Sequence, residues 1–204
     1  LKNYYYVGYN LRHHPILKFL KDYIKNKKIF SIYILCTSYL PFWRKKINYQ
    51  KSVSAQKKFG GGVLLELSHE IDYVNWIFGK FKNLNIFSKK ISDLKIDVDD
   101  ILNVTAKIKN SFLNVSLNFF SMSERRKILI DGANFSIDAD IIKNKLTIIE
   151  KSKKRKINFN NFKAINTYKD QIKCLLNGDN KNLCNIHQAS KVLKIISNIK
   201  KNIK

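Results

Sequence analysis

The chain has 204 residues, 45% of them hydrophobic, and a formal net charge of +24 from 39 basic and 15 acidic residues. This length suffices for a real hydrophobic core, and 2 prolines and 7 glycines argue against long disordered linkers. The 3 cysteines form no CxxC pair. This argues against a disulfide framework and a zinc site and favours a reducing, cytoplasmic location.

The excess of positive charge has two interpretations, nucleic-acid binding and A/T-rich codon bias. Lys, Asn, Ile, Tyr and Phe are all abundant, and all have A/T-rich codons. Arginine, which reads bases and phosphates bidentately, is scarce, and the lysines are scattered along the chain. We therefore expect no nucleic-acid partner, although the charge should favour anionic ligands in any cleft.

The first third of the chain predicts alternating strands and helices. Residues 4–9, YYYVGY, are aromatic and β-branched, which is typical of a short buried strand. Pro15 suits the first turn of a helix over residues 15–27. Residues 28–40 then alternate as a long strand does. The longest apolar run, residues 29–43, is too short for a membrane span, which needs about 20 apolar residues, so we expect no membrane partner.

The middle of the chain predicts a loop, a helix and then a meander of strands. Residues 41–59 are polar and aromatic without a clear period, whereas residues 60–78 have the broad apolar face of a helix that stops at Gly79. Short strands separated by turn signals follow, and we expect them to pair antiparallel because no helix intervenes. These strands are predicted over residues 83–91, 99–110, 112–121, 125–132, 135–142 and 145–151.

The last third contains a run of like charges and then two helices. The run KSKKRK, residues 151–156, is interpreted as a solvated strand end or loop, with a nucleic-acid patch as the alternative. Helices are predicted over residues 168–177 and 186–200. The predicted fold class is α+β: a mostly antiparallel open sheet with helices packed on one face.

Residues 60–76, GGGVLLELSHEIDYVNW, combine apolar helical spacing with several polar groups. A glycine-led helix start would leave free backbone N–H groups that suit an anionic or oxygen-rich ligand. Spacings of three and four residues place Glu66, His69 and Tyr73 on neighbouring helix faces. The residues alone leave two interpretations open: a polar face that lines an active site, or a structural pair of a histidine and an acid.

The order of four segments resembles the C-terminal domain of the Gfo/Idh/MocA family of NAD(P)-dependent oxidoreductases, the relatives of glucose–fructose oxidoreductase and inositol dehydrogenase. The segments are VGYNLRHHP at 7–15, GGGVLLELSHEIDYVNWIFG at 60–79, DVDDILNVTAKIKNSFLNVSLNFFS at 97–121 and TYKDQIKCLLNGDNKNLCNIHQASKVLKII at 167–196. Together they span nearly the whole chain. The resemblance to members that act on sugars of surface polysaccharides is weaker.

The resemblance implies a domain boundary. Residues 1–10 would be the last strand and exit of an N-terminal Rossmann domain, and residues 11–204 the C-terminal substrate-binding and oligomerisation domain. The chain has neither a GxGxxG fingerprint after a strand nor the family's Glu-Lys-Pro with its catalytic lysine. We therefore expect NAD or NADP to be bound mainly by the missing domain, with no cofactor-binding residue and no catalysis in this chain alone.

The resemblance also implies roles for individual residues. His69 would act as the catalytic base on a sugar or related polyol, with Glu66 orienting its ring. The family usually has Asp four residues before the histidine, whereas Glu stands three before it here. No second ligand lies at metal-binding spacing, so we expect no metal, and we expect Asp72 to pair locally. The expected substrate-binding residues are Asn10, Arg12, Tyr39, Trp43 and Tyr73.

The expected partners are a sugar-type small molecule and further copies of the chain, bound through the open sheet. Either the face carrying Leu113, Val115, Leu117 and Phe119 or the opposite face would form that contact. Two alternative functions stay open: a non-catalytic binding or oligomerisation module, and a basic nucleic-acid-binding protein. A start codon next to Leu1 would favour the module, and a steep salt dependence of binding would favour nucleic acid.

Overall fold

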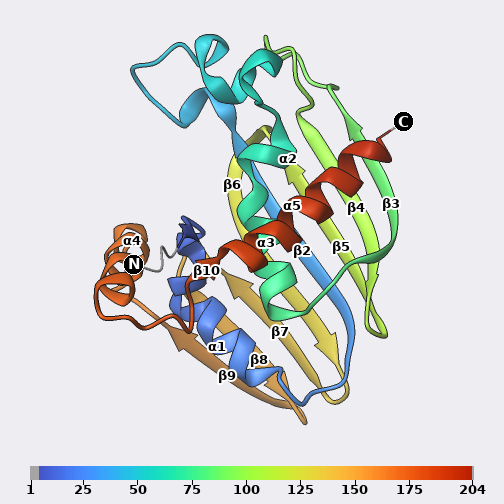
Figure 1. The fold of residues 1–204 in the computed structure, drawn as a ribbon. Helices are drawn as coiled ribbons and strands as arrows, with labels where there is room; N and C mark the ends of the chain where they lie inside the picture. Colours follow the sequence, from blue (N-terminus) through green and yellow to red (C-terminus); the bar gives the residue numbers. More distant parts are fainter. Residues whose placement is uncertain (1–4, 204) are drawn as a thin grey trace.

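The computed structural model describes residues 5–203, which form one open sheet of eight strands with helices on one face (Figure 1). Neighbouring strands are antiparallel except β2 and β5, which are parallel. The predicted mostly antiparallel α+β fold is therefore confirmed. In sheet order the strands are β3 (Lys82–Lys89), β4 (Ile101–Ile108), β5 (Ser111–Asn118), β2 (Ile29–Tyr39), β6 (Phe120–Gly132), β7 (Phe135–Asp140), β8 (Lys145–Glu150) and β9 (Lys153–Asn158).

Alternation along the strands determines which sheet face is buried. In β5, Leu113, Val115 and Leu117 are completely buried, whereas Phe112 on the other face is exposed. Successive strand residues point to opposite faces of the sheet, so every second residue of a strand contributes its side chain to the core. The face that carries Leu113 lies under the helices, and the opposite face is open.

The helices that cover the sheet are α1 (Pro15–Tyr23), α2 (Val63–Glu66), α3 (Ser68–Ile77) and α5 (Ile186–Lys201). Figure 1 shows α3 and α5 crossing in front of the central strands, with α4 (Ala164–Leu176) beside the sheet. α4 packs against the short helix η1 (Asn10–His13), and β1 (Tyr6–Val7) pairs with β10 (Cys184–Asn185). Short 3-10 turns occupy the loop after β2: η2 (Leu40–Phe42), η3 (Tyr49–Lys51), η4 (Val53–Ala55) and η5 (Lys57–Phe59).

Several predicted boundaries differ from the structure. The helix predicted over residues 60–78 is two helices, α2 and α3, because Leu67 leaves the helical conformation at φ −102° and ψ 29°. Neither proline nor glycine marks this break, and the Leu67 side chain is buried. The charged run forms the exposed strand β9, and α4 begins four residues earlier than predicted. Tyr4, in the predicted first strand, lies outside the described residues.

Candidate functional site

Two adjoining cavities lie at one end of β2 and β6. The first cavity has a volume of about 530 Å³ and lies between the end of β2, the start of β6 and the α2–α3 junction. The second cavity, about 390 Å³, lies between η1, α3, β6 and the start of α4. Both are lined by Glu124, Arg126 and Ile142, so the two cavities adjoin and share a wall, and together they are called the cleft below.

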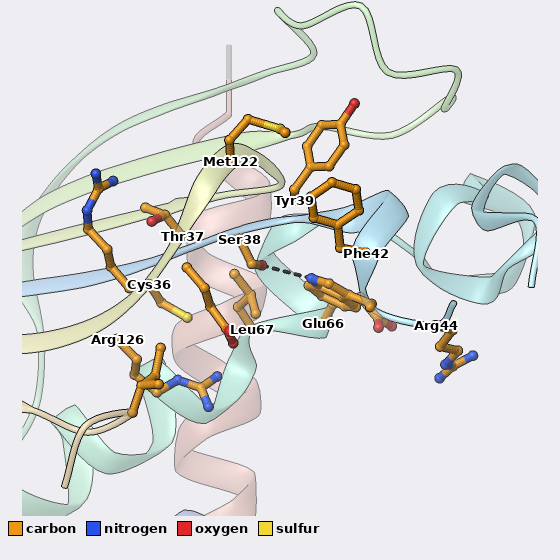
Figure 2. Close-up of a pocket in the computed structure, with 14 residues that line it drawn as sticks. Cys36, Thr37, Ser38, Tyr39, Phe42, Arg44, Glu66, Leu67, Met122 and Arg126 are labelled. Atoms are coloured by element: carbon orange, nitrogen blue, oxygen red, sulfur yellow. Dashed lines mark hydrogen bonds between the residues drawn. The ribbon is translucent and has the colours of Figure 1, made fainter. Parts of the chain in front are cut away.

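Aromatic residues from the end of β2 and from η2 line one wall of the first cavity. Trp43 is held by a hydrogen bond in which its Nε1 donates to Ser38 Oγ at 2.8 Å (Figure 2). The rings of Tyr39 and Phe42 meet edge to face at 4.8 Å. Aromatic rings held in this way can stack on an apolar face of a sugar. Tyr39 and Trp43, which were expected to bind substrate, thus both line the cleft.

Of the three glycines before α2, Gly61 packs closely against the preceding turn η4. A Cβ at Gly61 would come within 2.3 Å of the carbonyl oxygen of Val53, and Gly62 has φ of 107°. Three successive N–H groups already donate to carbonyls, Gly61 to Gln56, Gly62 to Ser54 and Val63 to Asp99. The prediction of a helix start with N–H groups free for a ligand is therefore wrong at these residues, since close packing and satisfied donors explain the glycines.

Glu66 and His69 lie in different cavities. Glu66 lines the first, where its Oε2 accepts a hydrogen bond from Ser54 Oγ at 2.6 Å, and His69 lines the second. No hydrogen bond joins the two side chains within residues 5–203. The expectation that Glu66 orients the imidazole is corrected accordingly: the break at Leu67 removes the regular spacing on which it depended.

His69 is half-buried at the wall of the second cavity. Its ring meets that of Tyr9 edge to face at 5.4 Å, and its Nδ1 is buried without a hydrogen-bond partner among the described residues. Burial lowers the pKa of His69 below its usual value of 6.5. The imidazole is therefore neutral near pH 7 and can accept a proton.

Asn10 lines the same cavity as His69, and its Nδ2 donates to Thr167 Oγ1 at 2.5 Å. This bond joins η1 to α4, so the start of α4 completes the cavity wall. Tyr168 of α4 also lines this cavity and is exposed.

Arg12 and Tyr73 lie outside the cleft. Arg12 is 1% exposed and makes a bidentate ion pair with Asp72, at 2.9 Å from Nε and 2.6 Å from Nη2. Tyr73 is completely buried, and neither residue lines either cavity. Asp72 was expected to pair locally, and it does form an ion pair, but with an arginine 60 residues away in the sequence. The burial of Arg12 and Tyr73 removes both from the site that we propose below.

Arg126 was missed from the sequence, although it lines both cavities. Its Nε lies 2.8 Å from Oε1 of Glu70, a carboxylate that is completely buried. Figure 2 shows its side chain extending beside Leu67. The alternation of β6 places Arg126 on the same face as the buried Ile128 and Ile130. An arginine at a core-facing strand position was the signal that could have identified it.

Residues 5–203 lack both a metal-binding cluster and a membrane-spanning helix. No three side chains of His, Cys, Asp or Glu gather closely enough to hold a metal ion. No helix in this part of the chain combines the length and apolar character that a membrane crossing requires.

The family model of the GFO/IDH/MocA C-terminal domain matches residues 17–138. The chain belongs to the Gfo/Idh/MocA family. This finding agrees with the fold described above. No curated protein sequence matches the chain.

Solved structures of other Gfo/Idh/MocA proteins share the fold. UDP-N-acetylglucosamine 3-dehydrogenase GnnA from Acidithiobacillus ferrooxidans is 13% identical, with a TM-score of 0.76 over 96% of this chain and 60% of that one. WlbA dehydrogenase from Bordetella pertussis, in complex with NADH and UDP-GlcNAcA, is 12% identical with a TM-score of 0.76, over 98% and 62%. A super-repressor mutant of Gal80p from Saccharomyces cerevisiae is 14% identical with a TM-score of 0.81, over 98% and 63%. The chain thus spans less than two thirds of each of these proteins.

Proposed function

We propose that the chain is the substrate-binding domain of an NAD(P)-dependent oxidoreductase that acts on a sugar or related polyol. The observation that carries this proposal is His69, a half-buried and neutral base at the wall of a cleft with an aromatic side. The domain would work joined to a nucleotide-binding domain that supplies the cofactor cradle and the catalytic lysine.

In the proposed reaction a sugar hydroxyl is oxidised to a carbonyl. The nicotinamide, when bound, supplies the hydride acceptor. His69 accepts the hydroxyl proton as the C–H bond of the same carbon breaks, so one proton and one hydride leave the substrate. Tyr39 and Trp43 stack on the sugar, and Asn10 helps to position the ring beside His69.

The similar structures support this substrate class and also provide the alternative. The titles of GnnA and WlbA describe dehydrogenases, one of a UDP-sugar and one in complex with NADH and a UDP-sugar. The Gal80p structure is described as that of a super-repressor mutant, so the fold also occurs in a protein whose title names repression and no dehydrogenase. A non-catalytic module is therefore the second candidate, and His69 distinguishes the two.

His69→Ala tests the proposed reaction in the protein that joins this chain to its nucleotide-binding domain. Turnover of UDP-sugar substrates, followed by the formation of reduced nicotinamide, should fall at least ~100-fold, the usual range for an acid–base group. In the unsubstituted enzyme, turnover should stay level near pH 7 and fall only below about pH 6.5, because the lowered pKa keeps His69 neutral above that.

The control is His187→Ala, which removes an exposed histidine of α5 outside the cleft and should leave turnover unchanged. Near-normal turnover in His69→Ala would remove His69 from the mechanism. A protein that oxidises no sugar under any of these conditions would instead favour the non-catalytic module.

We also propose that copies of the chain associate through the open sheet face. Its centre carries Tyr33 and Phe112, 41% and 45% exposed, with ring centroids 6.1 Å apart, and Leu129 is the register partner of Tyr33 on β6. The sequence left two sheet faces as candidates for this contact. The face that carries Leu113 is covered by helices of the same chain, so the opposite face is the one that a second copy can reach. An exposed aromatic and aliphatic patch on a sheet is typical of a subunit contact.

The double variant Tyr33→Lys/Phe112→Lys should shift the protein to a smaller species in light scattering after size exclusion, because two like charges would repel their symmetry mates. Leu193→Lys, on the exposed side of α5, should leave the mass unchanged. An unchanged mass in the double variant would place the subunit contact elsewhere.

A further inference from the structure

The side chain of Arg126 occupies the junction of the two cavities and is open to ligand. Its side chain is 26% exposed, whereas the Glu70 side chain with which it pairs is completely buried. The Nε atom lies 2.8 Å from Oε1 of Glu70. The two terminal nitrogens of a guanidinium carry four further N–H donors, and because Arg126 lines both cavities these groups can donate to a ligand there.

Glu70 holds the guanidinium in a fixed position. A buried carboxylate needs a paired cation, since an isolated charge in the interior is very costly. Moving Arg126 away would leave Glu70 without its partner, so the arginine is preorganised rather than free to swing out. Preorganised donors bind a ligand with a smaller loss of side-chain entropy.

We propose that Arg126 recognises an oxyanion on the substrate, a carboxylate or phosphate attached to the sugar. The planar guanidinium matches two oxygens of such a group. Its place between the aromatic wall and His69 would put that anion next to the reacting sugar. The net charge of +24 adds a field that attracts anions. This inference rests on the proposed substrate cleft and names the chemical class that enters it.

The test measures binding to the 204-residue chain without nicotinamide, by NMR titration with glucuronate, glucose 1-phosphate and glucose. At least one anion should bind about tenfold or more tightly than neutral glucose, the size expected for a bidentate charge-assisted contact. Arg126→Gln should abolish that preference. The matched control Arg155→Gln removes an exposed arginine of β9 outside the cleft and should retain it. The anion whose affinity depends more on Arg126 identifies carboxylate or phosphate.

Arg126→Lys serves if Arg126→Gln fails to fold, because it keeps the cation that pairs with Glu70. It should retain the fold in thermal unfolding and lose most of the preference, since lysine offers no planar fork. Equal affinities for glucose and both anions, or a preference that survives both variants, would overturn the inference. Loss of hydride transfer in the joined enzyme with an intact anion preference would refute the proposed function alone.

Discussion

Helix α3 supplies the carboxylates of two ion pairs, Asp72 with Arg12 and Glu70 with Arg126. The pairs differ in how many N–H donors of the arginine are already bonded within the protein. The guanidinium of Arg12 is 1% exposed and donates to Asp72 twice, to Gln188 Oε1 at 2.5 Å and to the Leu183 carbonyl at 3.4 Å. Arg126, by contrast, has a side chain that is 26% exposed, lies 2.8 Å from its acid at Nε and lines the cleft. We call Arg12–Asp72 the closed pair and Arg126–Glu70 the open pair. The closed pair has a structural role, whereas the arginine of the open pair is available to a ligand.

The closed pair connects elements that are distant in sequence. Arg12 comes from η1, Asp72 from α3 and Gln188 from α5, so one guanidinium fastens three segments together. Burial raises the pKa of Asp72 even though the hydrogen bonds from Arg12 act to lower it. The cost of desolvation is therefore large, and the pair should matter most when one member is removed.

The largest effect on stability is expected from Asp72→Ala, which leaves Arg12 buried without its acid. The free energy of unfolding, measured by urea denaturation, should fall by about 3–5 kcal/mol. The double variant Arg12→Met/Asp72→Leu should recover much of this loss because it removes both charges. A loss that is no smaller in the double variant would show that the unpaired charge of Arg12 does not cause the loss in Asp72→Ala.

A smaller effect is expected from Glu70→Gln, which keeps the shape of the side chain and removes its charge. Since Arg126 is partly exposed, solvent can compensate it, and the loss should be about 1–3 kcal/mol. The same urea denaturation measures it. A loss as large as that of Asp72→Ala would mean that solvent reaches the guanidinium of Arg126 no better than that of Arg12.

The smallest effect on the free energy of unfolding is expected for an ion pair on the surface. Lys127 and Asp138 form an exposed pair at 3.5 Å on β6 and β7. Asp138→Ala should change the free energy of unfolding by less than about 1 kcal/mol, because solvent screens exposed charges. This variant is the matched control for both buried pairs, since it removes the same kind of carboxylate from an arrangement open to water.

The sheet was largely predictable because its alternation is local. The inward positions of β5 after Ser111 are all aliphatic and each outward position except Phe112 is polar, so period two is readable from the sequence. The helix over residues 60–78 was predictable in kind and not in detail. Its break at Leu67 has no glycine or proline signal, and this break separates Glu66 from His69.

The site was only partly predictable, because the cleft is built by residues that the chain brings together from far apart. His69, Glu66, Asn10, Tyr39 and Trp43 were expected and all line the cleft. Arg12 was expected in the cleft and Arg126 was not, whereas Arg126 lines the cleft and Arg12 is buried outside it, because an arginine looks the same in sequence whether three acceptors or an open cavity surround it.

The sequence by itself determined the order of elements, the class of fold and the place of the polar helix within it, since these depend on periodicities of two and about 3.6 residues along the chain. The tertiary structure decided which arginine is saturated and which is open, which sheet face is covered, and that the glycine N–H groups are already bonded. Those outcomes depend on contacts between distant segments, and packing settles them only when all the segments are in place.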